Sequence, residues 1–191
     1  MKINYLYPLT LLFILFFTES CRSSRSTGKS SNTKDINEIT STVVISKRVS
    51  PVSIQTKNKV AGEVVSYAES LKGIRYQYGG TSKETGFDCS GFIWHVFNRF
   101  DIKVPRKSAD FTNAGREVPI SECRRGDIIL FTGSNPKSGI VGHMGIITKK
   151  SNDNLYFIHA ASGGGKGIMI SGMSEYFVTR FVKVIRVFTV F

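Results

Sequence analysis

A candidate nucleophile stands near the middle of the chain, where Cys89 follows a glycine and an aspartate and precedes an apolar run. Apolar residues then recur at intervals of three and four up to Phe100, which predicts a helix with one buried face. Asp88 has the residue type expected of its N-cap. A thiol in the first turn lies at the positive end of the helix dipole, which lowers the thiol pKa and favours the reactive thiolate.

Two histidines could supply the other groups that a thiol nucleophile needs. His143 can take and return a proton, and His159 can orient its imidazole, so that Cys89 and the two histidines form a catalytic set for acyl transfer. Taken alone, each has a structural alternative: free cysteines are often buried, and His159 shares one strand face with Leu155 and Phe157. The same three residues could also form an open zinc site.

The surrounding elements predict an α+β domain with its helices ahead of its strands. Residues 60–71 have one apolar helical face, and Gly73 supplies a stop. Short apolar runs after the nucleophile helix predict an antiparallel sheet, with strands at 128–131, 141–148, 155–160, 168–170 and 181–187. A turn at 152–154 makes the second and third of these strands a hairpin, which would bring His143 and His159 side by side.

Three motifs together resemble the NlpC-type family of bacterial cell-wall endopeptidases, whose fold is similar to that of papain. They are Gly86-Phe-Asp-Cys-Ser-Gly-Phe92, Gly142-His-Met-Gly-Ile146 and Phe157-Ile-His-Ala160, in this order, and the match runs from roughly Val60 to the C-terminus. The resemblance implies a papain-like cysteine peptidase without cofactor or metal that hydrolyses peptidoglycan stem peptides. The implied scissile bond joins γ-linked D-glutamate to the diamino acid.

The resemblance also implies roles for residues around the triad of Cys89, His143 and His159. A tyrosine before the double glycine helps to hold the oxyanion; Tyr76 fits that position better than Tyr78. Asp88 and Ser90 are expected to contact substrate, because these positions can bind the free amino group of a stem peptide in relatives.

Three residues further along the chain have expected roles outside the triad. Arg106, in a proline–arginine connection, is either structural or faces substrate. Cys123 has no nearby histidine, which favours a structural role; activation by the arginines that follow it is the alternative. Arg125 stands where relatives often have proline and is expected to alter a turn without affecting the chemistry.

The N-terminal region predicts export. Residues 1–20 contain an apolar run shorter than the about 20 residues that span a membrane, so they are interpreted as a signal peptide. Cys21 follows directly and resembles a lipoprotein processing site, which predicts a lipid anchor in a membrane of the bacterial envelope, facing the periplasm; a secreted protein cut near Ser20 is the alternative. Residues 21–59 are polar and basic and are predicted to be a disordered tether, and 60–191 form the catalytic domain.

The charge and the cysteines restrict the partners. Of the formal charge of +12, residues 22–59 and 60–191 each contribute +6, which favours loose attraction to anionic polymers. The basic residues lack the concentrated stripe of a nucleic-acid reader, so no nucleic-acid partner is expected. Three widely spaced cysteines argue against a disulfide framework. Two other functions stay open: an amidase or acyltransferase on another envelope substrate, and a peptidoglycan-binding lipoprotein without activity.

Overall fold

The computed structural model describes residues 53–151, 154–163 and 166–191. The predicted signal peptide, Cys21 and residues 22–52 of the predicted tether lie outside the described residues. The last part of that predicted tether packs on the domain: Ile54 and Thr56 are buried, and the Ile54 N–H donates to the carbonyl of Ala114 at 3.3 Å. The packed region therefore begins ahead of residue 60, because the apolar side chain of Ile54 joins the core.

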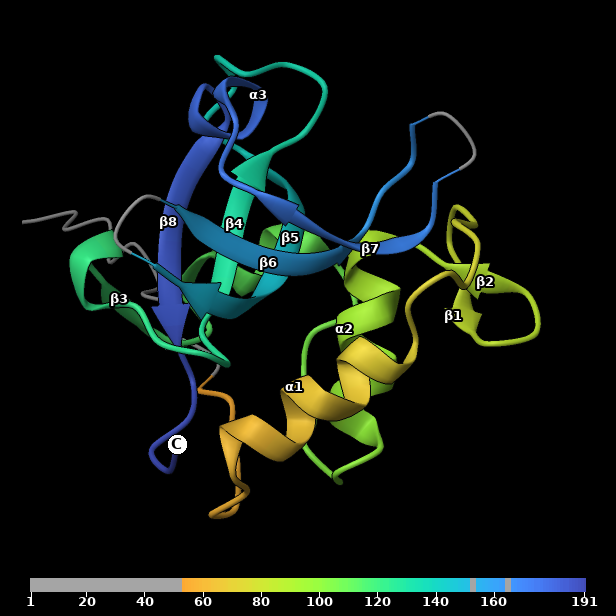
Figure 1. Cartoon of the computed structure of the whole chain (residues 1–191), viewed down its shortest axis with the longest axis vertical. Coiled ribbons are helices and arrows are strands. Elements are labelled where there is room, and N and C mark those ends of the chain that lie inside the picture. The colour runs from red at the N-terminus through yellow and green to blue at the C-terminus, as the bar shows by residue number, and fades with distance from the viewer. Residues whose placement is uncertain (1–52, 152–153, 164–165) are drawn as a thin grey trace, which may run out of the picture. The chain divides into compact units, whose positions relative to one another are not determined.

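Two ten-residue helices lie together beside the sheet in Figure 1, α1 (Ala61–Ser70) and α2 (Cys89–Asn98). Both agree with the predicted helices, and Asp88 is the predicted N-cap: its side chain accepts a hydrogen bond from the Gly91 N–H at 2.6 Å. After α1 the chain turns at Gly73, whose φ of +88° is the left-handed conformation that glycine adopts without strain. In the segment of the chain that connects α1 to α2, β1 (Thr81–Ser82) and β2 (Gly86–Phe87) form a small hairpin.

Six strands form one antiparallel sheet in the order β3-β8-β4-β5-β6-β7. They are β3 (Arg116–Val118), β4 (Ile128–Thr132), β5 (Val141–Lys150), β6 (Leu155–Ala160), β7 (Ile168–Gly172) and β8 (Phe181–Arg186). The predicted α+β class and the predicted β5–β6 hairpin are confirmed, although 152 and 153 of its turn lie outside the described residues. Short helical segments complete the domain: the 3₁₀ helices η1 (Ser108–Asn113) and η2 (Ile120–Glu122), and α3 (Glu175–Val178).

The sheet separates two apolar clusters. Because side chains alternate along a strand, Ile128 and Leu130 of β4 pack toward α1 and α2, while Ile129 and Phe131 pack on the opposite face. Phe177 of α3 covers part of that second face. All five residues of β4 are buried, which explains its apolar run from Ile128 to Phe131. Along the described parts of the chain, no helix combines the length and apolar character needed to cross a membrane.

Candidate active site

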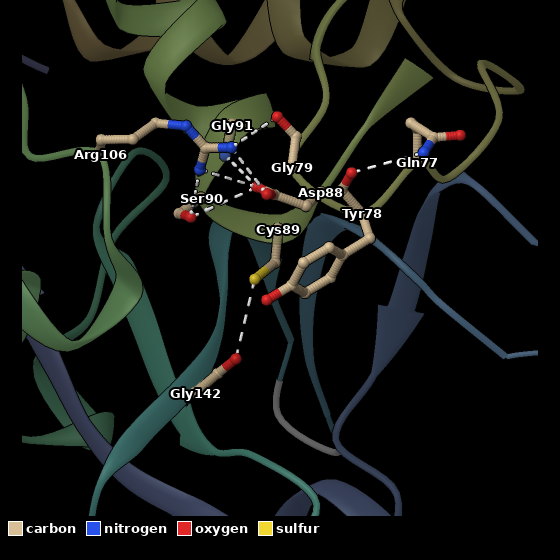
Figure 2. A network of polar contacts seen from close by, with 9 residues as sticks. All are labelled: Gln77, Tyr78, Gly79, Asp88, Cys89, Ser90, Gly91, Arg106 and Gly142. Carbon is tan, nitrogen blue, oxygen red and sulfur yellow. Dashed lines mark hydrogen bonds and ion pairs between the residues drawn. The ribbon is translucent and has the colours of Figure 1, made fainter. Parts of the chain in front are cut away.

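The predicted nucleophile lies where the start of α2 meets the start of β5. Cys89 is half-buried, and its Sγ donates a weak hydrogen bond to the Gly142 carbonyl oxygen at 3.8 Å, as Figure 2 shows. Gly142 is an extra residue in β5, because β4 pairs Phe131 with His143 and Thr132 with Val141. This β-bulge leaves Gly142 out of the β4–β5 register and brings its carbonyl to the thiol.

Glycines of the nucleophile motif allow the chain to fold closely around α2. The Asp88 N–H donates to the Gly80 carbonyl at 3.1 Å. A Cβ at Gly91 would overlap that same carbonyl oxygen, and a Cβ at Gly80 would overlap the carbonyl of Gly86. The Gly80 carbonyl can therefore lie against the first turn of α2 only because Gly91 has no side chain, and Gly80 can approach Gly86 for the same reason.

The two predicted histidines are brought together by the β5–β6 hairpin. His143 Nε2 and His159 Nδ1 are 2.8 Å apart, and the rings are nearly perpendicular at 82°. On the far side of His159, Nε2 lies 2.9 Å from the Ser171 hydroxyl of β7. The prediction that the hairpin brings the histidines side by side is confirmed. Ser171 was missed, because no motif surrounds it and only the β6–β7 register brings it close.

This chain of hydrogen bonds selects a tautomer if Ser171 acts as the acceptor. Then His159 carries its proton on Nε2, and its Nδ1 accepts from the Nε2–H of His143. His143 Nδ1 is left with a lone pair, which is the state required of a general base. Across the described residues no hydrogen bond joins the Cys89 Sγ to the His143 ring. The thiol instead donates to the carbonyl of Gly142, the residue before His143.

The protonation states differ from the prediction at the thiol. Burial, reinforced by the neighbouring Asp88 carboxylate, raises the pKa of Cys89 to about 11. The backbone N–H groups of Ser90 and Cys89 and the Arg106 guanidinium lower this pKa, as expected at a helix start, but their effect is smaller. The predicted low thiol pKa is therefore wrong, because desolvation outweighs the helix terminus.

Burial also keeps both imidazoles neutral. It lowers the pKa of His143 to about 4; burial, with smaller contributions from His143 and Lys166, lowers that of His159 to about 3. At neutral pH the resting site therefore holds a protonated thiol and uncharged histidines. Chemistry here requires His143 to remove the thiol proton as the sulfur attacks.

The two candidate oxyanion tyrosines have different surroundings. Tyr76 is partly buried and packs against the same apolar cluster as Cys89. Burial, followed by the charges of Cys89 and Asp88, raises the pKa of Tyr76, so its hydroxyl keeps its proton and can donate. Tyr78 is 86% exposed. The surroundings favour Tyr76 for this role.

Asp88 and Ser90 face inward, toward Arg106. The guanidinium donates to both carboxylate oxygens of Asp88, at 3.0 and 2.7 Å, and to the Ser90 hydroxyl at 2.9 Å (Figure 2). It also donates to the Gly79 carbonyl at 3.0 Å. Both side chains are buried and already paired, which counts against the predicted substrate contacts at Asp88 and Ser90.

The other candidates have structural surroundings. Cys123 is buried in the second apolar cluster, as predicted, and burial raises its pKa. Arg125 does more than alter a turn: it binds both carboxylate oxygens of Glu69 at 2.8 and 3.0 Å and the Thr148 carbonyl at 3.0 Å, joining α1 to β5.

A zinc site finds no support in the described part of the chain. It contains no group of three His, Cys, Asp or Glu side chains that could hold a metal ion. His143 and His159 also direct one nitrogen each at the other. Two cavities of about 360 and about 420 Å³ lie elsewhere, and neither is lined by the thiol or the histidines.

The fold and the site together define a papain-like domain, in which a cysteine begins a helix that packs on an antiparallel sheet carrying the histidine. Residues 73–186 match the model of the NlpC/P60 family, and the chain belongs to this family.

Relatives of this chain include named cell-wall enzymes. The chain is 34% identical over 131 residues to the murein DD-endopeptidase MepS/murein LD-carboxypeptidase of Escherichia coli strain K12, covering 67% of this chain and 63% of that protein. It is 30% identical over 95 residues to the γ-D-glutamyl-L-lysine dipeptidyl-peptidase of Bacillus subtilis, covering 50% of this chain and 31% of that enzyme. The solved structure of the peptidoglycan hydrolase RipB of Mycobacterium tuberculosis superposes with a TM-score of 0.53 at 30% identity, over 66% of this chain and 64% of RipB.

Proposed function

We propose that this chain is a cysteine peptidase that hydrolyses peptidoglycan stem peptides. The observation that carries the proposal is the meeting of three elements: the thiol at the start of α2, the bulged start of β5, and the paired histidines 143 and 159. Family membership and the names of the relatives support the substrate class.

In the proposed reaction, Cys89 Sγ attacks the carbonyl carbon of the scissile amide while His143 Nδ1 takes the thiol proton. The oxyanion is held by the Cys89 N–H and the Tyr76 hydroxyl, each worth about 2.7–4 kcal/mol if comparable to a known oxyanion donor. His143 then gives its proton to the departing amine. Water, deprotonated by the same imidazole, hydrolyses the thioester and restores the thiol. His159 holds the His143 ring throughout.

The preferred scissile bond joins γ-D-glutamate to the diamino acid, in line with the resemblance and with the name of the Bacillus subtilis relative. A second candidate is a D,D-bond of a peptide cross-link, because the Escherichia coli relative is named a DD-endopeptidase. The two reactions give different products: the first shortens stem peptides to end at glutamate, and the second separates cross-linked peptides without shortening them in this way.

Digestion of purified peptidoglycan by the wild type and by Cys89→Ala, with the released peptides identified by mass spectrometry, tests the proposal. We expect stem-peptide products from the wild type alone. Intact peptidoglycan after incubation with folded wild-type protein would favour the peptidoglycan-binding lipoprotein without activity. Release of another acyl group would favour the amidase or acyltransferase. Activity that persists in chelators would exclude the zinc alternative.

We further infer that the protein works in the cell envelope, with residues 1–20 as a signal peptide and Cys21 as a lipidated anchor. Because Ile54 and Thr56 are buried and the Ile54 N–H bonds to Ala114, the proposed tether is shortened to residues 21–52. Mass spectrometry of the mature N-terminus tests this inference: a diacylglyceryl-modified Cys21 is expected, and an unmodified N-terminus near Ser20 would indicate the secreted alternative.

A further inference from the structure

We propose that Arg106 is a positioning residue for the nucleophile: it neutralises Asp88 and fixes the first turn of α2 against the Gly79 turn. The inference rests on the proposed role of Cys89 as the nucleophile. Arg106 follows α2 in sequence, and its guanidinium reaches back to the segments on both sides of the thiol (Figure 2).

The contacts of Arg106 use both terminal nitrogens of its guanidinium. One terminal nitrogen donates to Asp88 Oδ1 and Ser90 Oγ, and the other to Asp88 Oδ2 and the Gly79 carbonyl. A lysine carries the same charge at a single point and cannot make this planar, bidentate pattern. Arg106 thus links the N-cap, the residue after the nucleophile and the glycine turn in one arrangement.

The charge of Arg106 matters because its partner lies next to the thiol. Asp88 immediately precedes Cys89 and, if unpaired, its buried carboxylate would oppose the formation of a thiolate. The titratable groups near the sulfur include Tyr76, which pairs with Phe87 of β2, and His143, next to Gly142 on β5. Both are uncharged at neutral pH, so Arg106 is the cation that offsets Asp88.

The test measures alkylation of Cys89 by iodoacetamide against pH, followed by peptide mapping so that Cys21 and Cys123 are counted separately. This readout does not depend on the peptidoglycan substrate. If the proposed function fails, the wild type will not cleave peptidoglycan, but the difference in Cys89 alkylation between wild type and variant can still be measured. In Arg106→Gln we expect the Cys89 alkylation rate at pH 8 to fall by about threefold or more, because below the pKa the thiolate fraction changes tenfold per pKa unit. An unchanged rate would overturn the proposal.

Arg125→Gln is the matched control. Arg125 also makes a bidentate pair with a carboxylate, and its side chain is 36% exposed, against 37% for Arg106. It binds near Thr148, six residues along β5 from Gly142, or about 20 Å in an extended strand. We expect Arg125→Gln to lower the melting temperature but leave the Cys89 alkylation profile at the wild-type position. An equal change in both variants would show a general loss of stability and overturn the proposal.

The Asp88→Asn background separates charge neutralisation from loop anchoring. Asparagine retains an oxygen that can cap α2 but carries no charge. If Arg106 acts by offsetting Asp88, Arg106→Gln should change Cys89 alkylation by less than about twofold in this background, a non-additivity expected of directly coupled residues. A full-sized effect would refute the electrostatic role.

Arg106→Lys keeps the proposal testable if the glutamine variant does not fold. We expect its Cys89 alkylation rate to stay within about twofold of wild type, because the charge remains, while kcat falls through loss of the fork geometry. A raised KM with unchanged kcat would instead assign Arg106 to substrate binding and overturn the proposal.

Discussion

The resting thiol should react as a half-buried, neutral group, and its rate of alkylation can be predicted. With a pKa of about 11, only about one Cys89 in 10⁴ is ionised at pH 7, roughly 300-fold less than a free cysteine with a pKa of about 8.5. A more basic thiolate is also more nucleophilic, with a Brønsted coefficient of about 0.45, which recovers roughly 13-fold. Cys89 should therefore react about 20-fold more slowly than a free thiol at pH 7.

The assay is the second-order rate of iodoacetamide modification of Cys89 between pH 5 and pH 10, measured by peptide mapping. We expect the rate to rise nearly tenfold per pH unit up to pH 10, because a pKa of about 11 keeps the thiolate a minor species throughout. A thiolate already paired with an imidazolium would give a flat profile between about pH 5 and 8. Such a plateau would refute the argument that desolvation controls this site.

Three other predictions follow from the same geometry. Because the pKa values of His143 and His159 are lowered in the folded protein, the unfolded chain binds more protons below about pH 6.5. The unfolding free energy should therefore fall by up to about 1.4 kcal/mol per pH unit for each histidine as the pH drops from 6.5 toward 4, measured by urea denaturation; His159→Asn should reduce this slope, and an equal slope would contradict the assignment. Ser171→Ala should lower kcat by about three- to tenfold at constant KM, because one hydrogen bond to His159 is lost; unchanged kcat would exclude a role for this bond. Gly91→Ala should destabilise the domain by about 1–3 kcal/mol, because its Cβ overlaps the Gly80 carbonyl; a melting temperature equal to wild type would show that the turn can move freely.

Long, periodic elements of the fold could be predicted from the sequence. Both ten-residue helices and the β4, β5 and β6 strands follow from apolar periodicity, and Asp88 could be identified as an N-cap from its type and position. The two-residue strands β1 and β2 and the four-residue α3 are shorter than the window in which periodicity can be detected. Ile54 was assigned to the tether because the polar composition around it obscured one apolar anchor.

The site was predictable in its members and less so in its electrostatics. The hairpin argument correctly placed His143 beside His159, because strand pairing follows from a turn and two alternating segments. The thiol pKa depends on burial, and the surroundings of the thiol include segments distant in sequence, such as the bulge at Gly142, whose carbonyl accepts from Sγ. No local pattern reveals those contacts, so the helix-start argument alone gave the wrong direction for the pKa.

Neutral resting groups are consistent with a hydrolase at this site. An ion pair between Cys89 and His143 would place two charges in a partly desolvated site, where the cost of desolvation can exceed their attraction. A proton transfer coupled to attack avoids this ion pair in the resting site, because the imidazolium forms only as the negative charge develops on the substrate oxygen. That oxygen would meet the Cys89 N–H and the Tyr76 hydroxyl, whose raised pKa keeps its proton in place. The burial that slows reaction of the free thiol would also strengthen the hydrogen bonds from these two donors to the oxyanion in the transition state. Slow alkylation and efficient hydrolysis can therefore coexist in one site.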